Sequence, residues 1–377
     1  MSRHGHNGRT FFSGRNLAHT IWGTTSSPTT VNPDSFFWRG HGAGSFTGWS
    51  GEAQVFVDLG KPTVYNFAGL LDVSQVLNSA RVSVDPYALV QSIPVELANV
   101  TISSGVVPAE NWTAKGLTLN GLDAVTIDLQ AMALDPGHYQ ITVHGNWKGS
   151  GNLVFKDGGT TVALKPGTSV SLTDPGGNFG LNIPAGLVGE VRKVEVFKRT
   201  NVGVTYPAFP NPHALGSLPY GQFPGDGQFD EGDLDGLTRN AVVLWPTDDE
   251  ANIQESHAVL IRLTNPGGSV AQIGGVHVGR GLQLPRSVDH NFKTNGATAR
   301  NGRRLSCVLS SLTNLEATGI VNLLNQAREE HQFVSVSSAL GDTPTLNEYF
   351  GKASYTTGVS HGVWRINITI QEDKREA

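Results

Sequence analysis

The sequence predicts a mainly β protein built from more than one domain. It contains 46 glycines and 19 prolines among 377 residues, and only 16% of the residues are charged. This composition gives many turns and few surface helices, as in proteins made of short strands. Short segments with a two-residue apolar period recur along the chain, which is the pattern of strands with one face on a core. A chain of this length can form two or three domains, each with its own core.

The front of the chain predicts an arm followed by several strands. The first 15 residues are polar, and we expect them to be disordered in isolation or to reach onto a neighbouring subunit. The apolar period is clearest at Val55, Val57 and Leu59, and the Gly60-Lys61-Pro62 sequence after it predicts a turn. The strands expected in this region cover residues 18–23, 35–39, 55–59, 64–71 and 80–84.

The segment from residue 94 to 199 predicts an inserted β-domain. Turn residues separate its strand candidates every 8–15 residues or so, a spacing that favours a small sandwich. Asp157-Gly158-Gly159 predicts a tight hairpin, because these residue types tolerate the positive φ angles of such turns. The expected strands are 95–103, 124–129, 138–144, 152–155, 160–164, 169–172 and 191–198.

The last third predicts strands around one helix. Residues 258–263 and 270–278 are expected to be strands joined by a Pro266-Gly267-Gly268 turn. A helix is expected over 314–329, where Thr313 and Glu316 form a capping box. The other strands predicted here are 304–309, 333–337, 347–355 and 362–371.

The order of four segments resembles the tail proteins of long-tailed bacteriophages. These segments are NLAHTIW from Asn16, FFWRG from Phe36, the run from Val55 to Val84, and IGGVHVG from Ile273, after which comes the small α+β tail. In that family a galactose-binding-like β-sandwich precedes a small assembly domain. The resemblance implies the following organisation: an N-terminal arm (1–15), a split galactose-binding-like β-sandwich (16–93 and 240–285), an inserted β-sandwich domain (94–199), a long connecting loop (200–239), and a C-terminal α+β, split-barrel-like domain (286–377).

Composition also limits the possible partners. The net charge of −5 is too small to imply a nucleic-acid partner, and no apolar run approaches the ~18 residues that a membrane span needs. The N-terminus lacks the apolar region of a signal peptide, and the one cysteine, Cys307, excludes an internal disulfide. We therefore expect a protein made in a reducing cytoplasm, with Cys307 as buried filler.

No motif for catalysis or a cofactor is found. The sequence has no P-loop, no nucleophile elbow, no HExxH and no zinc-type Cys/His cluster, so we expect no enzyme and no cofactor. An acidic stretch resembles a calcium loop only in part, because Val242 stands where a bidentate glutamate belongs. Calcium binding there and a plain acidic surface loop both stay open. The weak calcium candidates are Asp226, Asp230, Asp233 and Asp235.

Two further groups of residues are candidates for contacts. Exposed aromatic rings could bind a glycan, although aromatic residues at such places are more often core anchors. Residues 226–255 hold nine acids and residues 280–304 hold six bases, so these segments could pair between neighbouring subunits or stay separately solvated. The glycan candidates are Trp38, Trp49 and Trp147, and the subunit-contact candidates are Arg280, Arg286, Arg303 and Arg304.

The resemblance thus implies a structural component of a phage virion, located at the tail tip or baseplate. We expect a homo-oligomeric ring, trimeric or hexameric, in contact with tube, hub or fibre proteins of the tail and with a host-surface glycan. Two alternatives from other classes stay open. One is a carbohydrate-binding module or adhesin that acts alone, and the other is a polysaccharide-degrading enzyme that uses Asp230 and Asp233.

Overall fold

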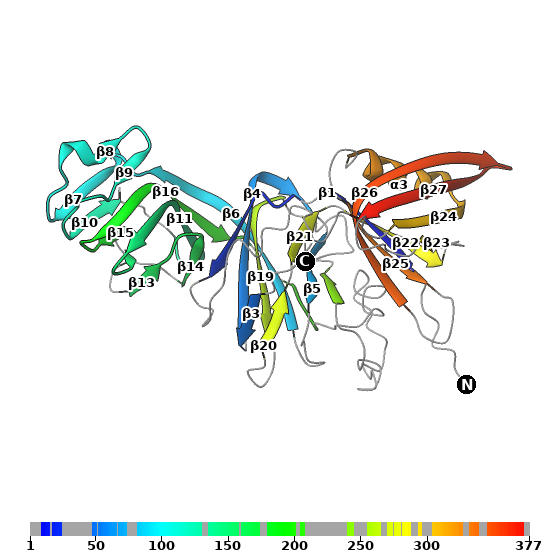
Figure 1. The fold of residues 1–377 in the computed structure, drawn as a ribbon, viewed down its shortest axis with the longest axis horizontal. Helices are drawn as coiled ribbons and strands as arrows, with labels where there is room; N and C mark the ends of the chain where they lie inside the picture. Colours follow the sequence, from blue (N-terminus) through cyan, green and yellow to red (C-terminus); the bar gives the residue numbers. More distant parts are fainter. Residues whose placement is uncertain are drawn as a thin grey trace.

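A computed structural model gives the architecture of the chain (Figure 1). Within the described residues the fold is mainly β with one α-helix, which confirms the predicted class. None of the described helices is long and apolar enough to cross a membrane. The described residues are 9–15, 17–24, 47–50, 52–65, 67–73, 81–129, 135–157, 160–173, 179–200, 204–207, 240–244, 255–264, 270–273, 275–279, 281–287, 293–295, 304–326, 332–338 and 345–372.

Seven strands of the largest sheet close into a ring. The hydrogen-bonded order is β6-β19-β4-β2-β14-β11-β16, and a further pairing of β16 with β6 completes the circle. The ring strands are β2 (Thr20–Thr24), β4 (Glu52–Val64), β6 (Arg81–Pro94), β11 (His138–Gly149), β14 (Thr168–Thr173), β16 (Leu187–Arg199) and β19 (Glu255–Thr264). Three short strands extend the sheet, namely β17 (Val204–Pro207), β9 (Gly116–Thr118) and β8 (Trp112–Thr113).

One junction of this strand ring is much weaker than the others. Strands β2 and β14 run parallel and share only two residue pairs, Gly23 with Thr168 and Thr24 with Ser169. All other neighbours in the ring pair antiparallel over at least four residues. The β2–β14 seam is therefore the place where the backbone contributes least to closure.

A five-stranded sheet packs against the outer face of the ring. Its order is β13-β12-β15-β10-β7, and its strands are β7 (Val100–Ser104), β10 (Val125–Leu129), β12 (Leu153–Asp157), β13 (Thr160–Leu164) and β15 (Phe179–Ile183). Side chains such as Ile127 and Phe155 from this sheet share one buried core with Ile141 and Val194 from the ring. The segment from residue 94 to 199 thus supplies the five-stranded sheet and also three strands of the ring, β11, β14 and β16.

The sequence located most strands of this segment and missed three. The pairing of Asp157 with Thr160 confirms the predicted hairpin between β12 and β13. The expected strand 95–103 is broken by a 3₁₀ turn, η1 (Leu97–Asn99), and only β7 remains of it. A second 3₁₀ turn, η2 (Ala109–Asn111), precedes β8. The missed strands are β8, β9 and β15.

The turn predicted at Gly60-Lys61-Pro62 is wrong, because β4 runs through these residues. The register against β19 jumps here, from Thr63 opposite Ser256 to Asp58 opposite Ala258, so that residues between them bulge out. Gly60 adopts a φ of 73°, and its backbone N–H donates to Asp58 Oδ1 at 2.7 Å. Gly60, whose sequence context predicted a turn, therefore lies in a β-bulge within β4.

The predicted single strand 270–278 is also wrong. It is two strands, β20 (Val270–Ile273) and β21 (Gly275–Gly279), in different sheets. β20 pairs with β3 (Thr47–Ser50), whereas β21 joins β5 (Phe67–Val73) and β18 (Asn240–Leu244) in a three-stranded sheet. Apolar residues lie on both sides of Gly274-Gly275, and this local pattern does not show that the chain changes its pairing partner there.

The C-terminal region forms a seven-stranded sheet with the helix. The order is β22-β1-β25-β26-β27-β24-β23. Helix α3 (Asn314–Gln326) begins at the predicted capping box, where Glu316 N–H donates to Thr313 Oγ1 and Thr313 N–H donates to Glu316 Oε2. The strands are β1 (Arg9–Arg15), β22 (Gly281–Ser287), β23 (Lys293–Asn295), β24 (Arg304–Leu312), β25 (Gln332–Ser338), β26 (Thr345–Ser360) and β27 (Val363–Glu372).

The expectation of a disordered N-terminal arm does not hold for residues 9–15. These residues form β1, which pairs with β22 on one side and β25 on the other. Because both edges of β1 are hydrogen-bonded, the backbone holds this segment although its sequence is largely polar. The first strand of the chain thus lies in a sheet otherwise made by the last hundred residues.

Candidate functional site

The structure places few of the candidate site residues. Trp147 is only 5% exposed and belongs to the core between the ring and the five-stranded sheet, so its role as an exposed glycan-binding ring is corrected to that of a core anchor. Trp49 lies in β3, Arg286 in β22 and Arg304 in β24. The remaining candidates lie outside the described residues, namely Trp38, Arg280, Arg303, Asp226, Asp230, Asp233 and Asp235. Among the described side chains no three acids, histidines or cysteines gather as metal ligands would.

Most of the buried polar side chains among the described residues lie on the inner face of the strand ring. Cross-strand partners share a face, and the register links Trp22, Phe56, Leu260 and Asp85 in one row. Rings from non-neighbouring strands meet on this face, since Phe56 of β4 contacts Phe197 of β16 with centroids 5.1 Å apart. This face is therefore the inside of the ring.

An aromatic plug fills the middle of the ring. Phe56, Tyr87 and Phe197 are at most 2% exposed, and Phe56 also packs edge to face on Tyr87 at 5.6 Å. Burial raises the pKa of Tyr87 to about 12, and nearby Asp85 acts in the same direction. Polar clusters lie on this inner face on both sides of the plug.

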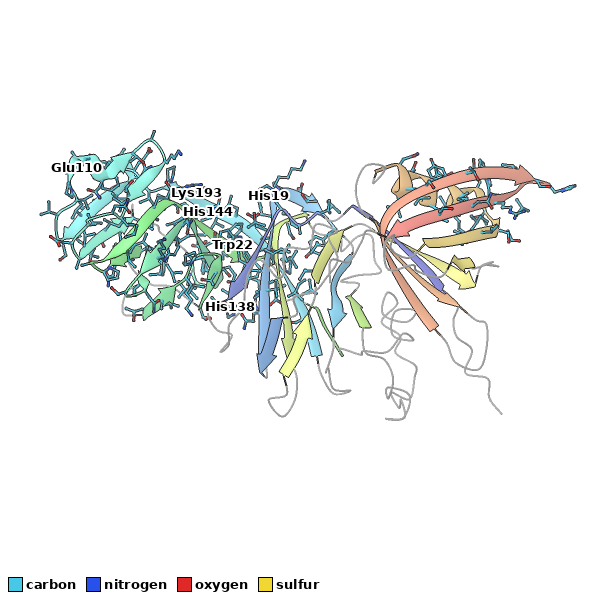
Figure 2. The ribbon with its side chains drawn as sticks, in the orientation of Figure 1. His19, Trp22, Glu110, His138, His144 and Lys193 are labelled. Carbon is cyan, nitrogen blue, oxygen red and sulfur yellow. The ribbon has the colours of Figure 1, made fainter. Side chains whose placement is uncertain are left out.

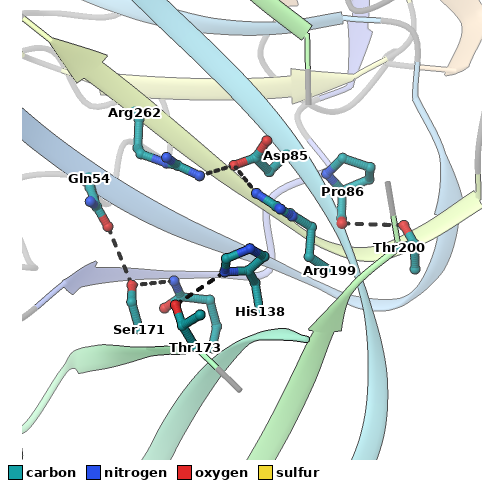
Figure 3. Close-up of polar contacts among 10 residues, drawn as sticks. Gln54, Asp85, Pro86, His138, Ser171, Thr173, Arg199, Thr200 and Arg262 are labelled. Atoms are coloured by element: carbon teal, nitrogen blue, oxygen red, sulfur yellow. Dashed lines mark hydrogen bonds and ion pairs between the residues drawn. The ribbon is translucent and has the colours of Figure 1, made fainter. Parts of the chain in front are cut away.

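The first cluster, which we call the arginine cluster, contains Asp85, Arg199 and Arg262 (Figure 3). Asp85 is 3% exposed, accepts a hydrogen bond from Arg262 Nη2, and lies 3.9 Å from Arg199 Nη1. A buried carboxylate is tolerated only when paired, so two cations from the flanking strands β19 and β16 account for its presence. The cluster links β6 to β19 and β16, its two neighbours in the ring.

A separate set of hydrogen bonds joins uncharged side chains on the inner face (Figure 3). Gln140 Nε2 donates to Ser171 Oγ at 2.5 Å, and Ser171 Oγ donates to Gln54 Oε1 at 3.4 Å. Ser169 Oγ donates to the other end of the same amide, Gln140 Oε1, at 3.1 Å. These bonds join β11, β14 and β4, so they span the β2–β14 seam from the inside.

The second cluster, which we call the histidine cluster, contains Ser92, His144, Lys193 and Glu195. Glu195 accepts hydrogen bonds from His144 Nε2 at 2.6 Å, Lys193 Nζ at 2.7 Å and Ser92 Oγ at 3.2 Å. Burial alone would raise the pKa of Glu195, but the bonds from His144 and Lys193 outweigh it and lower the pKa to about 2. Figure 2 shows His144 and Lys193 near Trp22, on the side of the ring that faces the five-stranded sheet.

A second buried acid lies near the histidine cluster. Asp58 is 8% exposed, and burial is the largest cause of its raised pKa, with a further contribution from the charge of Glu195. The N–H of Gly60 and the charges of His19 and His144 oppose this rise. The ring interior thus holds two carboxyl groups whose pKa values are shifted in opposite directions.

The hydrogen bonds of the histidine cluster link neighbouring strands and do not form a catalytic arrangement. A nucleophilic serine needs its hydroxyl bonded to a base, whereas the Ser92 hydroxyl donates to the carboxylate of Glu195. The three groups that bond Glu195 come from β6, β11 and its own strand β16. Sequence reasoning missed this cluster, although Gln140, Thr142 and His144 alternate with apolar residues, because that period also fits a strand facing water.

Two strand edges of the C-terminal sheet are open within the described residues. β25 pairs only with residues 345–351 of β26, so residues 352–360 are bonded to β27 alone. On the other side of the sheet, β23 covers only residues 304–306 of β24, so the edge of residues 307–310 is open as well. Among the described residues, strands β26, β27 and β24 therefore form a three-stranded unit with an unpaired edge on each side.

The chemistry of these edges suits strand addition. Residues 352–360 carry one charged side chain, Lys352, and no proline, and residues 307–310 carry no charge. Native proteins normally block a long edge with charges, proline or a bulge, because an open edge pairs readily with another strand. From Ser354 to Ser360 every side chain except half-buried Tyr355 is exposed.

No protein-family model, curated protein or solved structure matches this chain.

Proposed function

We propose that this chain is a structural protein of a phage tail tip or baseplate, which works by assembling with copies of itself into a ring. The observation that carries the proposal is that β24 and β26 each have an edge without a partner among the described residues. The order of segments along the chain, which resembles long-tailed phage tail proteins, supports the location. In this proposal the strands around β4 and β19 correspond to the galactose-binding-like sandwich.

The directions of the strands favour a ring over a two-fold dimer. β27 is antiparallel to both β24 and β26, so these two edge strands point the same way. If β24 of one copy adds to β26 of the next, the junction is parallel, and the same step can repeat until the circle closes. If β26 paired instead with β26 of a second copy, or β24 with β24, the junction would be antiparallel. Such a pair would stop at two copies and leave the other edge of each copy unpaired.

The side-chain period of the strands gives a direct test. Register places position 307 of β24 on the same face as Ile368, Tyr355 and Thr357, whereas Thr356 is on the opposite face. Cys307 is the one cysteine of the chain. If the copies form a continuous sheet in which position 307 of one copy lies opposite position 357 of the next, Thr357→Cys should form a disulfide between copies under mild oxidation. Thr356→Cys, on the opposite face, should not.

The full-length variants would be purified, oxidised and run without reductant. A ladder of covalent oligomers from the Thr357 variant alone, ending at the copy number of the ring, is the expected result. Equal cross-linking of both variants, or a wild-type chain that remains a monomer in light scattering at every concentration, would sink the assembly proposal.

The location is tested separately. Antibody against this chain, imaged on negatively stained phage particles, should label the end of the tail. Label on the capsid, or particles without label, would refute the tail-tip assignment even if the ring forms.

A further inference from the structure

Four buried side-chain atoms have no hydrogen-bond partner among the described residues, namely Trp22 Nε1, Thr142 Oγ1, Ser256 Oγ and Arg262 Nε. Two of them, the indole nitrogen of Trp22 and the hydroxyl oxygen of Thr142, lie on the inner face of the strand ring close to the β2–β14 seam. Trp22 is 6% exposed and Thr142 is fully buried. Buried N–H and O–H groups in native proteins are nearly always bonded, to protein or to ordered water, so two on one face require an explanation.

The two atoms lie on strands that flank the β2–β14 seam. Trp22 is in β2 and Thr142 in β11, with β14 between them, and Thr142 is directly opposite Ser169 of β14. The Trp22 ring reaches over β14, because it contacts His144 with centroids 5.0 Å apart. His144 is two residues beyond Thr142 on the same face of β11, so Trp22 and Thr142 converge on one region.

The polar hydrogens of two neighbouring side chains are already used. The Ser169 hydroxyl donates to Gln140 Oε1, and His144 Nε2 donates to Glu195. No described side chain bonds Trp22 Nε1 or Thr142 Oγ1, so a solvent molecule is the candidate partner. An indole N–H only donates, which excludes a cation at that atom, and the carboxyl groups of Glu195 and Asp58 nearby disfavour an anion.

We infer that the ring holds an internal water site between Trp22 and Thr142. Water accepts from the indole N–H and donates to or accepts from the hydroxyl, so it satisfies both atoms at once. The site lies where the backbone joins β2 to β14 by only two residue pairs. The water therefore bridges β2 to β11 across β14 and adds a polar link at the weakest junction of the ring.

A crystal structure of the full chain, at a resolution that shows ordered water, tests the site directly. The expected result is a water peak within about 3.2 Å of both Trp22 Nε1 and Thr142 Oγ1. A well-ordered ring without a peak that contacts both atoms would overturn the inference.

Unfolding in urea gives a second, independent test through paired variants. Thr142→Val keeps the shape of the side chain but removes the hydroxyl, and it should lower the urea midpoint. Thr142→Ser keeps the hydroxyl. If Trp22 and Thr142 share a water, the losses from Trp22→Phe and Thr142→Val are less than additive, whereas those from Trp22→Phe and Thr142→Ser add.

The opposite outcomes are equally clear. A Thr142→Val variant that is more stable than the wild type would show that the hydroxyl is an unsatisfied group without a bound water. Additive losses in the Thr142→Val pair would show that the two atoms do not share a ligand. Either result contradicts the proposed site.

Discussion

Substitution of Glu195 by glutamine should destabilise the strand ring at neutral pH but not in acid. The bonds from His144 and Lys193 lower the pKa of Glu195 from its ordinary 4.5 to about 2. A difference of about 2.5 units at 1.36 kcal/mol each corresponds to about 3 kcal/mol of folding stability. Because the folded-state pKa is the lower one, this stability is present above pH 4.5 and is lost as the pH falls toward 2.

The measurement is urea unfolding of wild type and Glu195→Gln at several pH values between 7 and 2. We expect the wild type to exceed the variant by about 3 kcal/mol at pH 7 and the difference to shrink steadily below pH 4.5. Glu110→Gln is the matched control, because Glu110 is exposed and lies in η2, away from the histidine cluster (Figure 2). A gap that stays the same at pH 3 as at pH 7 would show that the charge of Glu195 does not hold the ring.

Other substitutions test the arginine cluster, a tight backbone contact and the helix cap. Asp85→Asn should cost about 2–3 kcal/mol in urea unfolding, less than a fully buried pair because the arginines are partly exposed, and exposed Asp123→Asn should cost almost nothing. Gly189→Ala should reduce the melting temperature strongly, because its Cβ would lie 2.0 Å from Asn146 O at a φ of 132°, whereas Gly358→Ala has open space and should leave it unchanged. Thr313→Ala removes the cap of α3 and should cost about 1 kcal/mol, measured by chemical denaturation; no loss would contradict the capping role.

The elements that the sequence predicted are those whose signal is local. The capping box of Thr313 and Glu316 lies within four residues, and the Asp157-Gly158-Gly159 hairpin within a few more, so both could be found without knowing the fold. The alternation of Val363 and Arg365 with Ile366 and Ile368 likewise follows from one strand alone.

The elements that it missed depend on distant partners. Closure of the strand ring needs β6 to meet β16 and β2 to meet β14, and no short stretch of sequence encodes either meeting. The histidine cluster has the same origin, since Ser92 and Glu195 are bonded across 103 residues. Polar residues inside a ring and polar residues facing water give the same period, so only the closed topology separates the two interpretations.

The position of β1 has a consequence for the timing of synthesis. Its seven residues are made long before those of its partner β25, which begins only at Gln332. At about 5–20 residues per second, this strand waits roughly 15–60 s for that partner. A translation product that stops before β25 therefore leaves β1 with one of its two hydrogen-bonded edges unpaired.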